Sequence, residues 1–122
     1  MATNYIQPGT VIDYTNATGS TITSGSVVKI NKILGVAIAD IANGATGPVQ
    51  IEGVFDCPKL SGAVIAAGES LTWDVSAGNF DDQLATPATG DVTGAAAVAF
   101  EAAGNGVTTL AVKFTGTPGT VT

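Results

Sequence analysis

The sequence contains no histidine and no arginine, and only 11% of its residues are charged. Soluble domains carry about 25%. Without histidine, a Ser-His-Asp relay cannot form and the commonest metal ligand is absent. Four lysines are outnumbered by ten acidic residues, which gives a net charge of −6. Because nucleic-acid binding needs clustered cations to neutralise phosphates, we predict no nucleic-acid partner.

Cysteine is also scarce, since Cys57 stands alone. A single cysteine excludes an internal disulfide, and we interpret Cys57 as a small buried hydrophobe. Residues 1–9 lack the basic and apolar regions of a signal peptide, so we expect synthesis in the cytoplasm. The longest apolar runs, 33–39 and 95–100, fall far short of the ~20 residues of a membrane-spanning helix. We therefore predict no membrane partner.

Catalytic and phosphate-binding motifs are absent from the sequence. It has no Gly-x-Ser-x-Gly nucleophile elbow and no glycine loop ending in Gly-Lys-Ser or Gly-Lys-Thr. Four acids lie around the segment 75–92: Asp74, Asp81, Asp82 and Asp91. We interpret them as solvated turn residues, with calcium binding and a carboxylate pair for glycoside hydrolysis as alternatives. We predict a protein that is not an enzyme, with no catalytic residue, no metal and no cofactor.

What the sequence does contain is β-strand patterning. Strong period-two alternation, typical of strands with one buried face, occupies 49–55, 71–75 and 107–115. Weaker strand patterns occupy 10–15, 26–30 and 35–41. With glycine turns between them, these segments predict an all-β, mainly antiparallel fold, a small barrel or sandwich. At most one short helical turn is expected, near 58–67, where Pro58 suits a first helical position.

One order of elements occurs twice along the chain. The first copy has a turn at Ser24-Gly25, a strand, an alanine-rich segment from Gly35, a glycine turn and a further strand. The second begins at Ala67-Gly68, and its alanine-rich segment starts at Gly94. We interpret the echo as a repeated three-strand unit whose strands at Gly35 and Gly94 take equivalent places. Residues 10–122 are expected to form a single β domain that follows an arm of residues 1–9.

The few aromatic residues have mostly structural interpretations. Phe55, Phe100 and Phe114 lie on inferred inward strand faces and are predicted to be core residues. Trp73 has the same interpretation, with a partner-facing anchor as its alternative.

The N-terminal stretch carries Tyr5 and Ile6 and ends at Pro8-Gly9. It is too short to bury itself unless it pairs with something. It is therefore either a first strand of the domain's own sheet or a tethered arm that adds to the edge of a neighbouring sheet.

Five segments of the sequence match a known family in their order. They are residues 1–14, Ser24-Gly-Ser-Val-Val, Gly35-Val-Ala-Ile-Ala-Asp-Ile-Ala, Ile51-Glu-Gly-Val-Phe-Asp-Cys-Pro-Lys and Ala67-Gly-Glu-Ser-Leu-Thr-Trp-Asp. Together they resemble a family of small phage and prophage proteins, formerly a domain of unknown function, whose members look like capsid decoration or cement proteins. The resemblance runs from the first residue to the last alternating strand. The acid-rich segment 79–87 departs from it, and we expect a phage-specific surface hairpin there.

The resemblance implies a structural protein of the virion, made in the host cytoplasm and bound to the outer surface of an assembled icosahedral head. It implies homotrimers that stabilise contacts between subunits of the major capsid protein. The expected capsid-contact arm consists of Thr3, Asn4, Tyr5, Ile6, Gln7 and Pro8. The alternative is a head-fibre base or tail-associated β module that binds host glycans through Trp73 and the segment 79–87.

Overall fold

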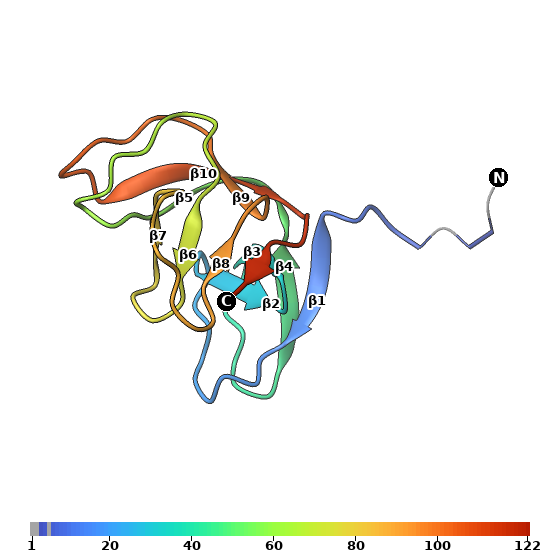
Figure 1. Ribbon diagram of the computed structural model, residues 1–122. Coiled ribbons are helices and arrows are strands. Elements are labelled where there is room, and N and C mark those ends of the chain that lie inside the picture. The colour runs from blue at the N-terminus through green and yellow to red at the C-terminus, as the bar shows by residue number, and fades with distance from the viewer. Residues whose placement is uncertain (1–2, 5) are drawn as a thin grey trace.

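The computed structural model describes residues 3–4 and 6–122, whose course is shown in Figure 1. These residues form strands, turns and bends and contain no helix, so they include none that could cross a membrane. The strands of the described chain are β1 Val11–Thr15, β2 Val27–Ile30, β3 Ile33–Ala37, β4 Thr46–Gln50, β5 Glu52–Pro58, β6 Thr72–Asp74, β7 Asn79–Asp81, β8 Val92–Thr93, β9 Ala97–Ala99, β10 Thr109–Thr115 and β11 Thr120–Val121.

The strands form three antiparallel sheets, ordered β1-β4-β3-β2, β5-β10-β9 and β11-β8-β6-β7. The predicted all-β, mainly antiparallel fold is confirmed. The helical turn allowed near 58–67 does not form. There the N–H groups of Lys59 and Ile65 donate to the carbonyls of Thr108 and Ala103, and a single turn joins the Ala63 N–H to the Leu60 carbonyl. The segment is therefore held mainly by residues distant in sequence.

The order of elements that occurs twice in the sequence corresponds to a hydrogen-bond pattern that also occurs twice. Pairs of residues that share a bridge, a strand register or a backbone hydrogen bond in the first unit have counterparts in the second. In the following list each pair of the first unit is given before its counterpart in the second: Ile22–Ile41 and Ile65–Ala103; Gly25–Ala37 and Gly68–Ala99; Val27–Val36 and Ser70–Val98; Ala37–Val49 and Ala99–Val112; Thr15–Thr46 and Pro58–Thr109. The predicted repeat therefore exists in the structure.

The repeated unit is larger than the three strands expected from the sequence. It has four: β1, β4, β3 and β2 in the first unit, and β5, β10, β9 and the chain entering β6 in the second. The predicted strand 49–55 is interrupted at Ile51, where the chain crosses from one unit to the next. Val28 of the first unit is equivalent to Leu71 of the second. Because Val28 pairs with Gly35 and the N–H of Leu71 donates to Ala97, Gly35 corresponds to Ala97 and not to Gly94. The residues 75–92 are an insertion between two strands of the second unit.

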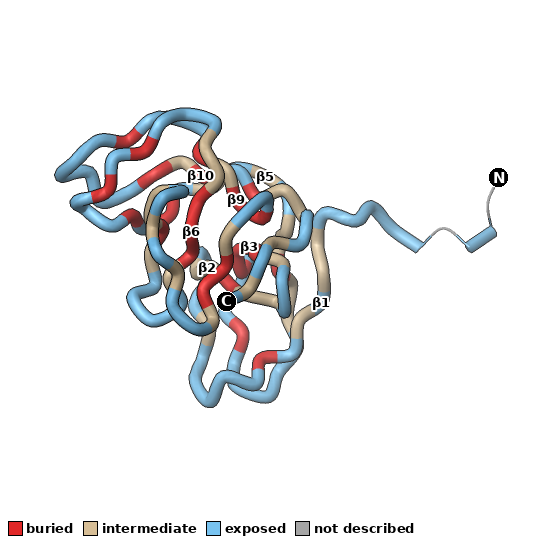
Figure 2. The backbone as a smooth tube through the Cα atoms, in the orientation of Figure 1, coloured by how far each residue is buried: buried red, intermediate tan, exposed pale blue. Residues whose placement is uncertain are grey.

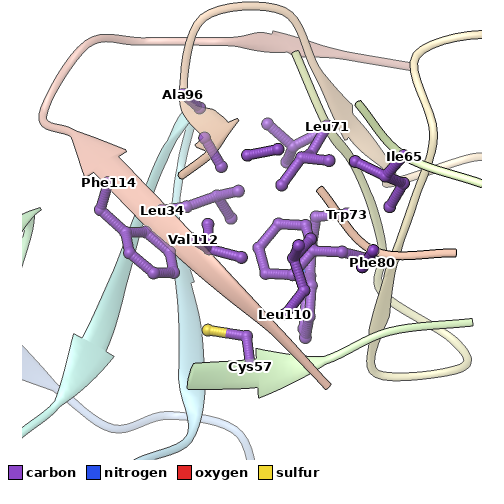
Figure 3. Close-up of a cluster of buried hydrophobic side chains, with 14 of the residues drawn as sticks. Leu34, Cys57, Ile65, Leu71, Trp73, Phe80, Ala96, Leu110, Val112 and Phe114 are labelled. Carbon is purple, nitrogen blue, oxygen red and sulfur yellow. The ribbon is translucent and has the colours of Figure 1, made fainter. Parts of the chain in front are cut away.

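The two units share one hydrophobic core. Leu34 and Val36 of β3 pack against residues of the second unit that include Cys57, Val112 and Phe114 (Figure 3). Because side chains alternate along a strand, the other face of the first sheet faces away from this core. It carries a smaller cluster made of Val28, Ala37, Ile41 and Val49. Buried backbone positions accordingly lie in both units, while the turns at their ends are exposed (Figure 2).

The phenylalanine predictions were correct in part. Phe114 is fully buried and Phe55 is half-buried against the core. The prediction for Phe100 was wrong, because its side chain is 61% exposed. Ala97 and Ala99 take the inward positions of β9, so the alternation places Phe100 on the outer face.

Candidate binding surfaces

The described residues of the N-terminal arm, 3–4 and 6–9, are exposed. Figure 1 shows the described part of the arm extending away from the body. Of the six predicted contact residues, Tyr5 lies outside the described residues, and the others are Thr3, Asn4, Ile6, Gln7 and Pro8. Ile6 is 88% exposed, and the described arm residues belong to no strand. The arm thus carries an unburied branched side chain.

Trp73 is a core residue, which is the first of its two predicted roles. Its side chain is 7% exposed and packs on Phe80, with ring centroids 4.8 Å apart. The ring also lines two surface pockets. Any contact of Trp73 with a partner would therefore take place inside these pockets.

The acids of the insertion hold turns together. Hydrogen bonds from the Ala77 N–H and then from the Ser76 hydroxyl lower the pKa of Asp74. Asp91 is only 4% exposed and accepts the Val75 N–H at 3.2 Å, so its interpretation as a solvated residue was wrong. Among the residues that the structure describes, no three His, Cys, Asp or Glu side chains gather into a metal site.

The segment 79–87 is only partly the surface feature expected. Phe80 is fully buried, whereas Leu84 is 86% exposed. The core position of Phe80 was missed because the sequence around it shows no alternation. The aromatic rings between residues 73 and 87 are those of Trp73 and Phe80, and both are buried. The large side chain that this segment exposes is therefore Leu84 and not an aromatic ring.

Cys57 is the small buried hydrophobe predicted. Its side chain is 1% exposed and belongs to the larger core cluster. Burial, and then the charge of Asp56, raises the pKa of the thiol to about 12. Because the thiolate is the nucleophilic form, Cys57 is chemically inert near neutral pH.

Two adjoining pockets lie beside β2, at a place that the sequence did not indicate. Their volumes are about 370 and 410 Å³. Both are lined by Ser26, Val27 and Trp73, so together they form one groove. No local pattern could have revealed the groove, because its walls come from both units.

A surface of mixed character lies on the outer face of the sheet β5-β10-β9, where Glu52, Asp56 and Lys113 are exposed beside apolar side chains. Val54, Lys113 and Val98 are aligned across its strands. Val54 is 44% exposed, and Phe100 follows β9 on the same face. This surface is outside the shared core and is open to a neighbour.

Comparison with known proteins finds one family. A family model described as phage cement protein matches residues 6–114. The match begins in the arm and ends in β10, so it includes both repeated units. No curated protein matches the chain.

Proposed function

The chain belongs to the phage cement protein family, whose role is capsid decoration, and we propose that it binds the major capsid protein on the outer surface of the assembled head. The net charge of −6 supports an outer location, since an acidic protein is repelled by packaged DNA. The proposed role is mechanical and requires no catalytic group.

We place the shell contact on residues 1–9, as an arm distinct from the body of residues 10–122. The exposure of Ile6, at 88%, is the observation that carries this assignment. Burying this branched side chain against the shell would contribute about 1.5–3 kcal/mol. An extended segment can add to the edge of a neighbouring sheet through its backbone.

We further propose that three copies associate on the head. The outer face of the sheet β5-β10-β9 supports this, because it exposes Val54 and Phe100. Aromatic residues are enriched in interfaces, which favours Phe100 as part of this contact, while the charged Lys113 and Asp56 lie on the same face. A trimer would carry three arms, and the binding of one arm would raise the effective concentration of the other two.

The stabilising effect follows from mass action. A protein that binds the assembled shell, and not its dissociated subunits, shifts the equilibrium towards assembly. If each trimer spans several capsid subunits, dissociation must break all of its contacts together. The shell is then held by many contacts that are individually weak.

Deletion of residues 1–8 tests the shell contact. The shortened protein should keep the melting temperature of the full chain and should no longer bind expanded heads in a sedimentation assay. As a point variant, Ile6→Ser should weaken binding at each site by about tenfold or more. Leu84→Ser is the matched control, because it removes an equally exposed branched side chain outside the arm, and it should bind nearly as well as the wild type. Normal occupancy by the deleted protein would contradict the proposal.

A further inference from the structure

The two repeated units differ at one strand position. In the second unit β7 lies along the edge of β6, with Thr72 paired to Asp81 and Trp73 to Phe80. On its other side β7 meets the chain that follows β5, where the Leu60 N–H donates to the Phe80 carbonyl at 2.9 Å. A parallel bridge joins Lys59 and Phe80. Thus β7 closes the second unit between its two outermost strands.

The first unit has no described strand at this position. Its sheet ends at β2, which corresponds to the chain entering β6, and at β1, which corresponds to β5. The Ala37 N–H donates to Ser26, and hydrogen-bonded pairs alternate along an antiparallel ladder. Val28 and Ile30 therefore bond to β3, and the backbone groups of Val27 and Lys29 point away from it. Within the described chain, no backbone partner bonds this outer edge.

The pocket of about 370 Å³ lies in the gap where a closing strand would fit. Val28 of β2 lines one side, and Tyr14 of β1 and Ile22 line the other. The equivalent space in the second unit is filled by the fully buried Phe80. The first unit is thus open where β7 closes the second, and the gap of about 370 Å³ is also lined by Trp73 and Val75.

We propose that this slot accepts an extended strand of the major capsid protein, which pairs antiparallel with β2 and inserts a branched or aromatic side chain as Phe80 does in the second unit. The inference rests on the proposed function and adds a second shell contact to the arm. Open strand edges readily accept a strand from another chain.

Elimination among the segments of this protein points to the capsid protein as the donor of the strand. Its named strands are already paired within the body, so a second copy could donate only its arm. The arm is assigned to the shell and leaves the body at β1, the opposite edge of the same sheet. Although the chain has ten acids, none lines the groove, so the donated strand need not be basic.

Proline on β2 tests the slot. Lys29→Pro removes the outward N–H and places ring atoms on the edge, while an edge strand can keep its bonds to the inner strand. Its affinity for expanded heads should fall by at least about tenfold. Lys29→Ala controls for loss of the side chain, whose Nζ donates to Gly90 at 3.0 Å. Thr15→Pro controls for an edge proline elsewhere, since Pro58 occupies the equivalent position in the second unit.

Amide hydrogen exchange provides a readout that does not depend on the variant. In the free protein, the amides of Val27 and Lys29 should exchange quickly and those of Val28 and Ile30 slowly. On heads, the first two should become protected. If Lys29→Pro binds like the wild type, or if these amides stay unprotected on heads, the inference is wrong. Loss of binding on arm deletion would then still support the proposed function.

A second copy as the donor would give a different result. Protection of Val27 and Lys29 would appear in the free protein as its concentration rises, and deletion of residues 1–8 would abolish it. That outcome would overturn the assignment of the slot to the capsid protein.

Discussion

Lys59 is a buried cation whose substitution should strongly destabilise the fold. It is 3% exposed, and its Nζ donates to the carbonyls of Leu60 at 2.9 Å, Gly104 at 3.0 Å and Val107 at 3.0 Å. These bonds tie the chain after β5 to the turn before β10. In the first unit the equivalent residue is Asn16, which is also buried and donates to loop carbonyls. Both units thus secure this loop with one buried polar side chain.

Lys59→Met removes the donor and keeps much of the side-chain length. Each buried carbonyl left without a donor costs about 1–3 kcal/mol. These three carbonyls lose a bond and a fourth, that of Ser61, loses a longer one of 3.5 Å, but water can reach some of them because the loops are at the surface. We expect a loss of about 3–4 kcal/mol from the carbonyls left without a donor. At about 3–5 °C per kcal/mol for a domain of this size, the melting temperature should fall by about 10–15 °C.

Urea and thermal unfolding of the variant measure this loss. Lys113→Met is the matched control, since Lys113 is exposed on β10, and its change should stay within about 0.5 kcal/mol. If Lys59→Met lies within about 1 kcal/mol of the wild type, water replaces the ammonium at all of these carbonyls. The reasoning about this buried group would then be refuted.

Two further predictions concern the turn acid and the outer sheet face. The hydrogen bonds that Asp74 accepts lower its pKa from 3.8. Folding therefore favours the charged carboxylate, and the stability that Asp74 contributes is fully present above pH 3.8. Asp74→Ala should therefore lower the melting temperature at neutral pH, and the difference should vanish as the pH falls through the lowered pKa; an equal difference at every pH would contradict this. Phe100→Asp should leave the melting temperature nearly unchanged, because the side chain is 61% exposed, and should reduce the self-associated mass in light scattering. If the proposed trimer forms in solution and its mass is unchanged in this variant, the contact between copies lies elsewhere.

Much of the fold could be predicted because its signals are local. Period-two alternation located the strands, and glycine turns separated them. The repeat was visible because the same order of turn, strand and alanine-rich segment recurs, and the hydrogen bonds follow it. The burial of Cys57 followed from its residue type. These inferences need only a residue and its near neighbours along the chain.

The candidate sites were less predictable, because exposure depends on which elements cover a strand. Phe100 and Phe80 are both phenylalanines near short strands, yet one is exposed and the other is fully buried. Nothing nearby in the sequence distinguishes them. Phe80 is buried because the insertion folds back over β6, and Phe100 is exposed because no described element covers the outer face of β9.

By itself the sequence determined the strand composition, the repeat, the lack of the usual catalytic groups and the resemblance to phage cement proteins, since each depends on residue types in order. Tertiary structure decided where the first unit stops and the second begins, at Ile51. It also decided that the second unit is closed by β7 and that the first is open along β2. Whether an edge is paired depends on a strand distant in sequence, and this long-range pairing leaves no local pattern.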